Sequence, residues 1–208
     1  DVALSHNLQN DITNSIASTF TWEERTPYNT FVSGASQFSQ STSVINDVIT
    51  NVTGVDQVVV YDVIPTDAGT ACVGDLFTVT VTVKSEPVGS FDTDAECSDV
   101  ALSYDLQNNI TANNGVVSTF SWIAADNANT IGESLVAKSG SIINDIVTNI
   151  SGGDEIVTYT VTPYSANGNC IGTPFNIDIT IYSEPKGFND AVAVCSDVAF
   201  NYNLQTSN

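Results

Sequence analysis

Basic side chains are scarce in this chain. Four Lys plus Arg residues stand against 24 Asp plus Glu residues, which gives a formal net charge of −20. Binding to nucleic-acid phosphates or to anionic lipid requires clustered cations that release counterions. The charge balance therefore argues against nucleic acid and anionic membrane surfaces as partners. The same surface attracts cations, and Ca²⁺ is the one cofactor that we consider.

Long apolar runs and catalytic motifs are also missing. No run approaches the roughly 18 to 20 residues of a membrane span, so we expect no membrane insertion. The sequence contains no Gly-x-Ser-x-Gly turn, phosphate-binding loop or Cys-x-x-Cys pair. The single histidine, His6, is replaced by Tyr104 and Tyr202 at matching positions of the repeats described next, and it cannot serve two Ser-His-Asp sites. We predict that the protein is not an enzyme. Asp1 begins no signal peptide, and we expect the chain to be a piece cut from a longer one.

What the sequence does contain is a repeat. Val58 to Pro87 recurs almost residue for residue as Ile156 to Pro185, 98 residues later. Each copy holds two runs in which β-branched or aromatic residues alternate with small polar ones, joined by a Cys/Gly loop, which predicts a hairpin of half-buried strands. The period matches a common domain size. We therefore divide the chain into repeat 1 (residues 1–86), repeat 2 (87–185) and the start of a third repeat (186–208).

A second motif marks the beginning of each repeat. Asp1 to Gln9 returns as Asp99 to Gln107 and as Asp197 to Gln205, and we interpret it as an opening strand. Three openings and two closing hairpins indicate a tandem array. Because an unpaired strand invites strand addition, the expected partners are neighbouring repeats of the same chain or of like chains.

The predicted core is aromatic. The strand-like run Ser18 to Trp22 recurs as Ser118 to Trp122, and a Trp on an early strand typically fills the centre of a two-sheet sandwich. The predicted fold class is therefore an all-β sandwich in each repeat. The candidate core residues are Trp22, Trp122, Tyr61 and Tyr159.

One segment of each repeat shows the spacing of apolar residues that is typical of a helix and not of a strand. Residues 43–54 and 141–152 place apolar residues at i, i+3, i+4 and i+7, with Ser before and Gly after. This pattern predicts a short amphipathic helix with both caps, although its many β-branched residues weaken the prediction. A bent strand is the alternative.

The linkers that begin at Ser85 and Ser183 each carry a strand-stopping Pro and can also contribute a first edge strand to the next domain. Carboxylates cluster near the first linker, and a Ca²⁺ site there would stiffen the joint. Against this, no spacing typical of a calcium loop occurs, and acidic surfaces are often simply solubilising. The candidate ligands are Glu86, Asp92, Asp94 and Asp99.

The four cysteines form two matching sets, Cys72 with Cys170 and Cys97 with Cys195. The absence of Cys-x-x-Cys spacing argues against zinc, and disulfides are expected if the protein is exported. We favour a Cys97–Cys170 bridge inside repeat 2, which would stabilise it by roughly 4 kcal/mol on the chain-entropy model. The alternative bridges each domain to the next through Cys72–Cys97 and Cys170–Cys195.

The motifs Cys-Ser-Asp at 97–99, Phe-Ser-Trp at 120–122, Tyr-Thr-Val-Thr-Pro at 159–163 and Cys-x-Gly-x-Pro-Phe at 170–175 carry a resemblance. They resemble the PKD-like, immunoglobulin-like repeats of very large secreted surface proteins of Bacteroidetes. The resemblance implies tandem immunoglobulin-like β-sandwiches, each with one short helix or helical turn, located outside the cell on its surface. It also implies a structural role in a stalk or filament of an adhesin or gliding-motility protein, and it supplies no catalytic residues.

A second function is open. Such repeats also occur as glycan- or surface-binding modules of adhesins and of modular secreted enzymes, and exposed aromatics would be their mark. The loop that differs most between the repeats offers Tyr28, Phe31 and Phe38, where repeat 2 is rich in Ala and Asn. These residues predict either a stacking platform for surface polysaccharide or an edge strand with core aromatics.

Overall fold

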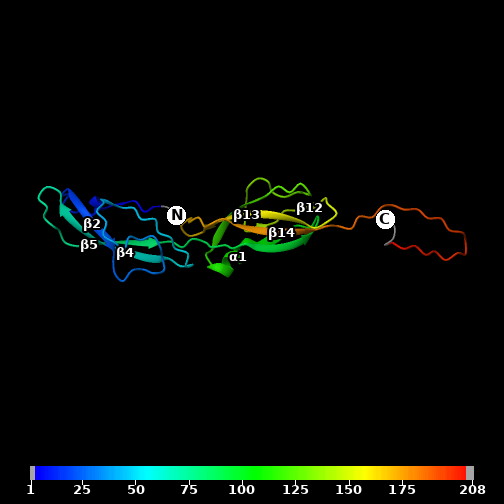
Figure 1. Cartoon of the computed structure of the whole chain (residues 1–208), viewed down its shortest axis with the longest axis horizontal. Coiled ribbons are helices and arrows are strands. Elements are labelled where there is room, and N and C mark those ends of the chain that lie inside the picture. Colours follow the sequence, from blue (N-terminus) through cyan, green and yellow to red (C-terminus); the bar gives the residue numbers. More distant parts are fainter. Residues whose placement is uncertain (1–2, 205–208) are drawn as a thin grey trace.

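The computed structural model describes residues 3–204, which form two β-rich units in a row followed by an extended tail (Figure 1). Asp1 and Gln205, which the sequence assigns to the opening motif, lie outside the described residues. Each unit has its own cluster of buried apolar side chains, one within repeat 1 and one within repeat 2. The chain is therefore a tandem of separately packed β-sandwich domains.

The main sheet of repeat 2 has the strand order β10-β8-β13-β14-β6. Strands β13 and β14 form the predicted antiparallel hairpin, and β6 runs parallel to β14, with Asp92 opposite Ile177 and Cys97 opposite Tyr182. The prediction that the linker contributes a first edge strand is confirmed by β6. The strands are β6 (Asp92–Cys97), β8 (Ser118–Ala124), β10 (Lys138–Ser139), β13 (Glu155–Ser165) and β14 (Phe175–Tyr182).

The second layer of repeat 2 consists of short pieces. Strand β7 (Tyr104–Asp105) pairs with β11 (Ile142–Ile143), and β9 (Thr130–Ile131) pairs with β12 (Thr148–Asn149). Helix α1 (Leu106–Asn113) begins where the Asp105 side chain accepts a hydrogen bond from the Gln107 amide, a usual helix cap. Leu106 and Ile110 on this helix are buried in the core.

Repeat 1 has the same plan with fewer strands. Its sheet has the order β2 (Ser18–Glu24), β4 (Gln57–Asp67) and β5 (Phe77–Val83). Strand β1 (His6–Asn7) pairs with β3 (Val44–Ile45), and the 3-10 helix η1 (Leu8–Asp11) stands in the place of α1. Within the described residues no strand covers the outer edge of β5.

The predicted core aromatics are buried. Trp22 and Trp122 are each 2% exposed, and Tyr61 and Tyr159 are fully buried. Each Trp meets the Tyr of its own repeat edge-to-face, with ring centroids 5.5 Å apart in repeat 1 and 5.7 Å apart in repeat 2. Such pairs add specific geometry to the large apolar area that they bury.

The helix predicted over residues 43–54 and 141–152 is wrong. Both segments are extended, and every second residue faces inward, including Asp47 and Asn51 in repeat 1 and their counterparts in repeat 2. This is the period of a strand. The β-branched residues favour it, and the alternative of a bent strand describes the segment better.

The predicted opening strand is also mostly wrong. In repeat 2 only Tyr104–Asp105 pairs as a strand, and the helix α1 begins at Leu106. Residues 197–204 form no strand. Repeat 2 carries two more residues before β8 than repeat 1 carries before β2, and these lengthen the four-residue 3-10 helix into an eight-residue α-helix.

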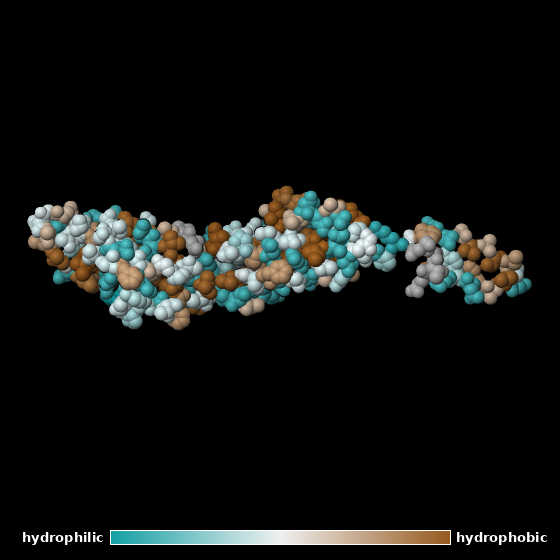
Figure 2. Space-filling model, viewed as in Figure 1, coloured by the Kyte–Doolittle hydropathy of each residue, from teal (hydrophilic) through white to brown (hydrophobic). Residues whose placement is uncertain are grey.

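Residues 186–204 extend beyond repeat 2 as a tail, on the side away from repeat 1 (Figure 1). Figure 2 shows brown, apolar side chains along this tail with no larger body around them. Among residues 3–204, no helix has the length and apolar character required to cross a membrane.

Candidate functional site at the joint between the repeats

The joint begins where the chain leaves β5. The Glu86 amide donates to the Asn51 carbonyl at 2.8 Å, and the Ser85 hydroxyl accepts a hydrogen bond from the Gly54 amide at 2.9 Å. The buried Asn51 side chain donates in turn to the carbonyls of Val55 and Val83, each at 2.8 Å. The linker is therefore held against repeat 1 from its first residues.

Asn114, directly after α1, connects both repeats and the linker. Its Nδ2 donates to the Glu86 carbonyl at 2.7 Å and to the Val52 carbonyl at 3.2 Å, and its Oδ1 accepts from the Val88 amide at 3.2 Å. Gly54 is required here, because its φ is +87° and a Cβ would lie 2.2 Å from the Asn114 carbonyl oxygen. One amide side chain of repeat 2 thus bonds to both repeat 1 and the linker.

Asn109, on α1, holds the next part of the linker. Its Oδ1 accepts from the Ser90 amide and its Nδ2 donates to the Ser90 carbonyl, both at 2.9 Å. The same Nδ2 donates to the Tyr104 hydroxyl, which donates to Asp92 at 2.6 Å. Burial and then the hydrogen bond to Asp92 raise the pKa of Tyr104 well above its ordinary value, so its hydroxyl stays a donor.

The linker also passes close to the β13–β14 hairpin. A Cβ on Gly172 would lie 2.1 Å from the Pro87 carbonyl oxygen, and a Cβ on Gly89 would lie 2.2 Å from the Phe175 ring. Both contacts exclude any side chain other than hydrogen. The linker is therefore a packed part of repeat 2.

A buried carboxylate lies at the same place in both repeats. Asp145 accepts hydrogen bonds from the Ser134 amide and hydroxyl at 2.7 Å, from Lys138 Nζ at 2.9 Å and from the Tyr159 hydroxyl at 3.1 Å. Burial alone raises the pKa of Asp145, but these donors, Lys138 first, outweigh it and hold the pKa below its usual value. Burial together with Asp145 raises the pKa of Tyr159 far above its ordinary value.

Asp47 repeats this arrangement in repeat 1. It accepts from the Ser36 amide at 2.7 Å, from the Ser36 hydroxyl at 2.6 Å and from the Tyr61 hydroxyl at 2.6 Å. The position of Lys138 is taken by Gln40, and in the part of the chain that the structure describes no lysine pairs with Asp47. The network joins the extended 43–54 segment to the main sheet and serves the stability of the domain.

The four acids predicted to bind Ca²⁺ are not brought together. Asp92 is bonded to Tyr104, and Asp99 accepts from the Thr148 hydroxyl beyond the other end of β6. Glu86 lies on the repeat 1 side of the joint. Among residues 3–204 no three His, Cys, Asp or Glu side chains converge as metal ligands. A Ca²⁺ effect on the joint stays a prediction from the sequence.

The four cysteines are free thiols in the structure. Cys97 lies beside Tyr182 at the end of β14, whereas Cys170 lies in the loop that precedes the start of β14. The length of this strand is roughly 25 Å, at about 3.3 Å per residue, and a disulfide needs Cα atoms within about 7 Å. The favoured Cys97–Cys170 bridge is therefore not compatible with this fold.

The predicted aromatic platform lies in the loop between β2 and β3. Phe31 is 68% exposed and Phe38 is 81% exposed, so neither belongs to the core. The Tyr28 hydroxyl donates to the Gln37 carbonyl at 3.0 Å, which places Tyr28 next to the residue that precedes Phe38. The alternative of an edge strand with core aromatics does not describe these side chains.

Sequence reasoning missed the asparagines that hold the joint. Asn114 and Asn109 read as polar loop residues, and their partners are backbone groups that no side-chain pattern reveals. One signal was available: the two extra residues of repeat 2 fall just before Asn114, at a place where the repeats otherwise correspond.

Comparison with known families agrees with this architecture. The family model of the PKD-like domain matches residues 1–87 and again residues 94–185. The chain therefore belongs to the PKD-like domain family, as two tandem copies. Such domains are typically extracellular structural or binding modules, and their immunoglobulin-like sandwich is generally non-catalytic. No curated protein matches the chain.

Proposed function

We propose that the chain is a spacer: a pair of structural repeats in a stalk or filament of a large secreted cell-surface adhesin, where it provides reach and mechanical stability. The observation that carries this proposal is the joint. The linker pairs with repeat 2 as β6 and is tied to repeat 1 through Asn114, so the two domains hold one orientation. A spacer needs a fixed orientation between its domains, because a pair of domains joined by a free hinge can fold back and does not keep its ends apart.

Replacing Asn114 with Ala should loosen the joint without unfolding either repeat. The change removes three hydrogen bonds that connect Val52, Glu86 and Val88. Small-angle X-ray scattering should show a shorter maximum dimension and a more flexible particle than the parent chain. The thermal transitions of the repeats should change little, because Asn114 contributes nothing to either apolar core.

Asn14 supplies the matched control. Its Oδ1 accepts from the Ile16 amide as Asn114 Oδ1 accepts from the Val116 amide, but among residues 3–204 Asn14 makes no hydrogen bond to the linker that follows Ser85. Asn14→Ala should leave the scattering profile unchanged. The same scattering measurements with Ca²⁺ and with a chelator test whether Ca²⁺ stiffens the joint. Because the joint is held by amide side chains, we expect the scattering profile to be the same in both conditions. If the parent and Asn114→Ala chains were equally flexible, the result would contradict the spacer proposal.

A glycan- or surface-binding module is the second candidate, and the observation that favours it is the exposure of Phe31 and Phe38. Aromatic faces on a rigid domain stack readily on sugar rings, which present apolar faces. Replacing both residues with Ser should abolish retention in affinity electrophoresis on a polysaccharide that retards the parent chain. Val136→Ser, in the corresponding loop of repeat 2 and 78% exposed, is the control. Unchanged retention in the double variant would exclude the platform.

A further inference from the structure

The dipeptide Asn-Gly occurs twice in the chain, at Asn114–Gly115 and at Asn167–Gly168. In such a pair the backbone nitrogen of the glycine attacks the side-chain carboxamide of the asparagine, because no Cβ obstructs the approach. The N–Cγ bond forms, the Cγ–Nδ2 bond breaks and ammonia leaves, which gives a cyclic imide. Water then opens the ring to aspartate or isoaspartate. Asparagine is thermolabile for this reason, and the first of the two pairs lies at the joint.

The glycine of this pair is not required by the fold. Gly115 has a φ of +72°, but a Cβ built on it would meet nothing within 4 Å. Ser15 occupies the same place in repeat 1 with a φ of +60°. The position therefore accepts a side chain, and the glycine of repeat 2 leaves the Asn114 carboxamide open to attack from the backbone.

The closed joint prevents this attack. Closure of the five-membered ring requires the Gly115 nitrogen and the Asn114 Cβ to lie nearly eclipsed about the Cα–C bond. Asn114 has a ψ of −1°, so the Gly115 nitrogen instead eclipses the backbone nitrogen of Asn114. The Gly115 amide also donates to the Ile110 carbonyl at 2.9 Å, and the Asn114 carboxamide is held by its three bonds at the joint. Asn114 can therefore react only after the end of α1 and the joint have opened.

The product of the reaction cannot close the joint again. Nδ2 of Asn114 donates to the carbonyls of Glu86 and Val52 at 2.7 and 3.2 Å. An aspartate in its place only accepts hydrogen bonds, so a carboxylate oxygen would face two carbonyl oxygens. Isoaspartate adds a methylene group to the main chain as well, which displaces Gly115 from the Ile110 carbonyl.

We propose that Asn114 is a deamidation site that records opening of the joint. The closed joint protects the residue, and reaction in the open joint converts a rigid pair of repeats irreversibly into a hinged pair. This inference rests on the joint of the proposed spacer and adds a modification that ends its rigidity. Scattering from Asn114→Ala tests the joint, and the rate of deamidation tests the protection, so either can fail alone.

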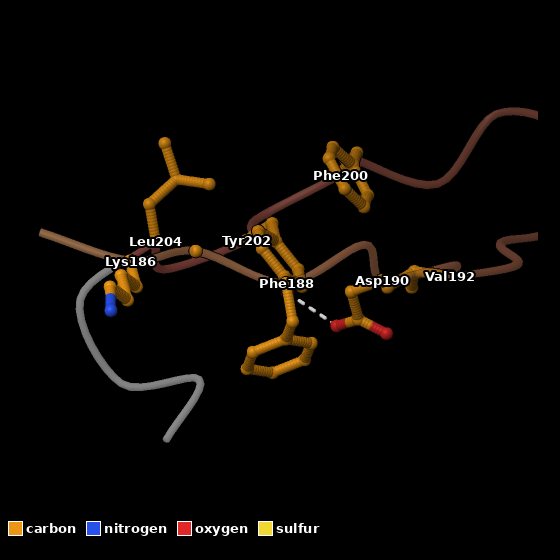
Figure 3. Close-up of a pocket in the computed structure, with 8 residues that line it drawn as sticks. Lys186, Phe188, Asp190, Val192, Phe200, Tyr202 and Leu204 are labelled. Atoms are coloured by element: carbon orange, nitrogen blue, oxygen red, sulfur yellow. Dashed lines mark hydrogen bonds between the residues drawn. The ribbon is translucent and has the colours of Figure 1, made fainter. Parts of the chain in front are cut away.

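The linker stays on repeat 2 when the joint opens. Asn109 holds the linker through Ser90, and Tyr104 donates to Asp92 at 2.6 Å. The bond from tyrosine to aspartate recurs where the third repeat begins, between residues 202 and 190 (Figure 3). It therefore belongs to the linker and the opening motif that follows it, and not to the joint. The hinge produced by deamidation lies between repeat 1 and the linker.

Asn167 provides an internal reference for the rate. It is exposed in the β13–β14 loop, and in the described part of the chain its side chain makes no hydrogen bond. Peptide mapping by mass spectrometry follows both asparagines during incubation of the full chain at mildly alkaline pH. We expect Asn114 to react at least about tenfold more slowly in the folded chain than in urea, because only chains with an open joint react. Asn167 should change less. Equal rates at Asn114 in the folded and unfolded chains would overturn the proposal.

Gly54→Ala should remove the protection. The added Cβ would lie 2.2 Å from the Asn114 carbonyl oxygen and so forces the joint apart. Gly152→Ala, at the matching position of repeat 2, meets nothing within 4 Å and is the control. The rate at Asn114 should rise toward the unfolded rate in the first variant only, with the fluorescence of Trp22 and Trp122 showing that both repeats stay folded. A protected Asn114 in a folded Gly54→Ala chain would contradict the proposal.

Asn114→Asp introduces the product directly, without any need for the reaction. Its scattering should show the shorter and more flexible particle expected of Asn114→Ala, whereas Asn167→Asp should match the parent chain. Prolonged incubation of the parent chain should produce the same change. Gly115→Ser, which copies Ser15 of repeat 1, should keep the rigid profile through that incubation, because its side chain hinders the attack. A rigid Asn114→Asp chain would overturn the proposal, since deamidation would then leave the joint closed.

Discussion

Replacing Asp145 with Ala should lower the free energy of unfolding of repeat 2 by about 3 to 5 kcal/mol, because it leaves several buried hydrogen-bond donors unsatisfied. The substitution leaves the buried Ser134 amide and hydroxyl and the Tyr159 hydroxyl without their acceptor. Each such group carries a desolvation penalty of about 1 to 3 kcal/mol. Urea unfolding followed by Trp122 fluorescence in a Trp22→Phe background measures repeat 2 alone, since each repeat contains one Trp.

Acid should act on the same group. Because the pKa of Asp145 lies below its usual value in the folded state, its stabilisation is complete above the ordinary carboxyl pKa of about 3.9 and is lost as the pH falls through the lower folded value. Asp145→Asn should therefore lose stability at neutral pH and show a shallower decline in acid. Asp126→Ala removes an exposed carboxylate of the same repeat and should change the unfolding free energy little. A parent-like urea midpoint for Asp145→Ala would contradict the role of the network.

Trp22→Ala should destabilise repeat 1 by about 3 to 5 kcal/mol, the range measured for removing a large aromatic from a core. The indole is 2% exposed and packs against Tyr61. Its Nε1 donates to the carbonyl and hydroxyl of Thr42 at 3.1 and 3.2 Å, so the substitution also removes two hydrogen bonds. Calorimetry should show one transition displaced to lower temperature.

Repeat 2 should respond weakly to Trp22→Ala, because the two cores share no residue. In this variant all tryptophan fluorescence comes from Trp122, which reports directly on repeat 2. Trp22→Phe keeps most of the apolar volume and should cost less than half as much. If the native fluorescence of Trp122 were lost in the same transition as the fold of repeat 1, the two domains would unfold as one unit.

The strands of the main sheets could be predicted because their inner positions are filled by apolar or aromatic residues. The alternation around Tyr61 and Tyr159 is unambiguous, and the 98-residue period places the three long strands of each sheet (β2, β4 and β5; β8, β13 and β14) in both repeats. The prediction that the linker can supply an edge strand is confirmed by β6, although the polar residues of this strand give a weak signal of their own.

The extended segment at 43–54 was misread for a physical reason. Two of its inward positions hold Asp47 and Asn51, which are buried only because Ser36, Tyr61 and backbone groups satisfy them. Without those partners in view, the remaining apolar residues fall at helical spacing. The helix itself lies at Leu106–Asn113, where Asn and Gln outnumber apolar residues and only the Asp105 cap marks its start.

The parallel pairing of β6 with β14 decides how repeat 2 would carry tension. The chain enters repeat 2 at the start of β6 and leaves it at the end of β14, and these two strands are neighbours running in the same direction. Pulling on the two ends therefore slides one strand along the other, and the evenly spaced hydrogen bonds of a parallel pair are loaded together. An antiparallel pair pulled from one end would open one bond at a time. The repeat is thus built to be loaded in shear.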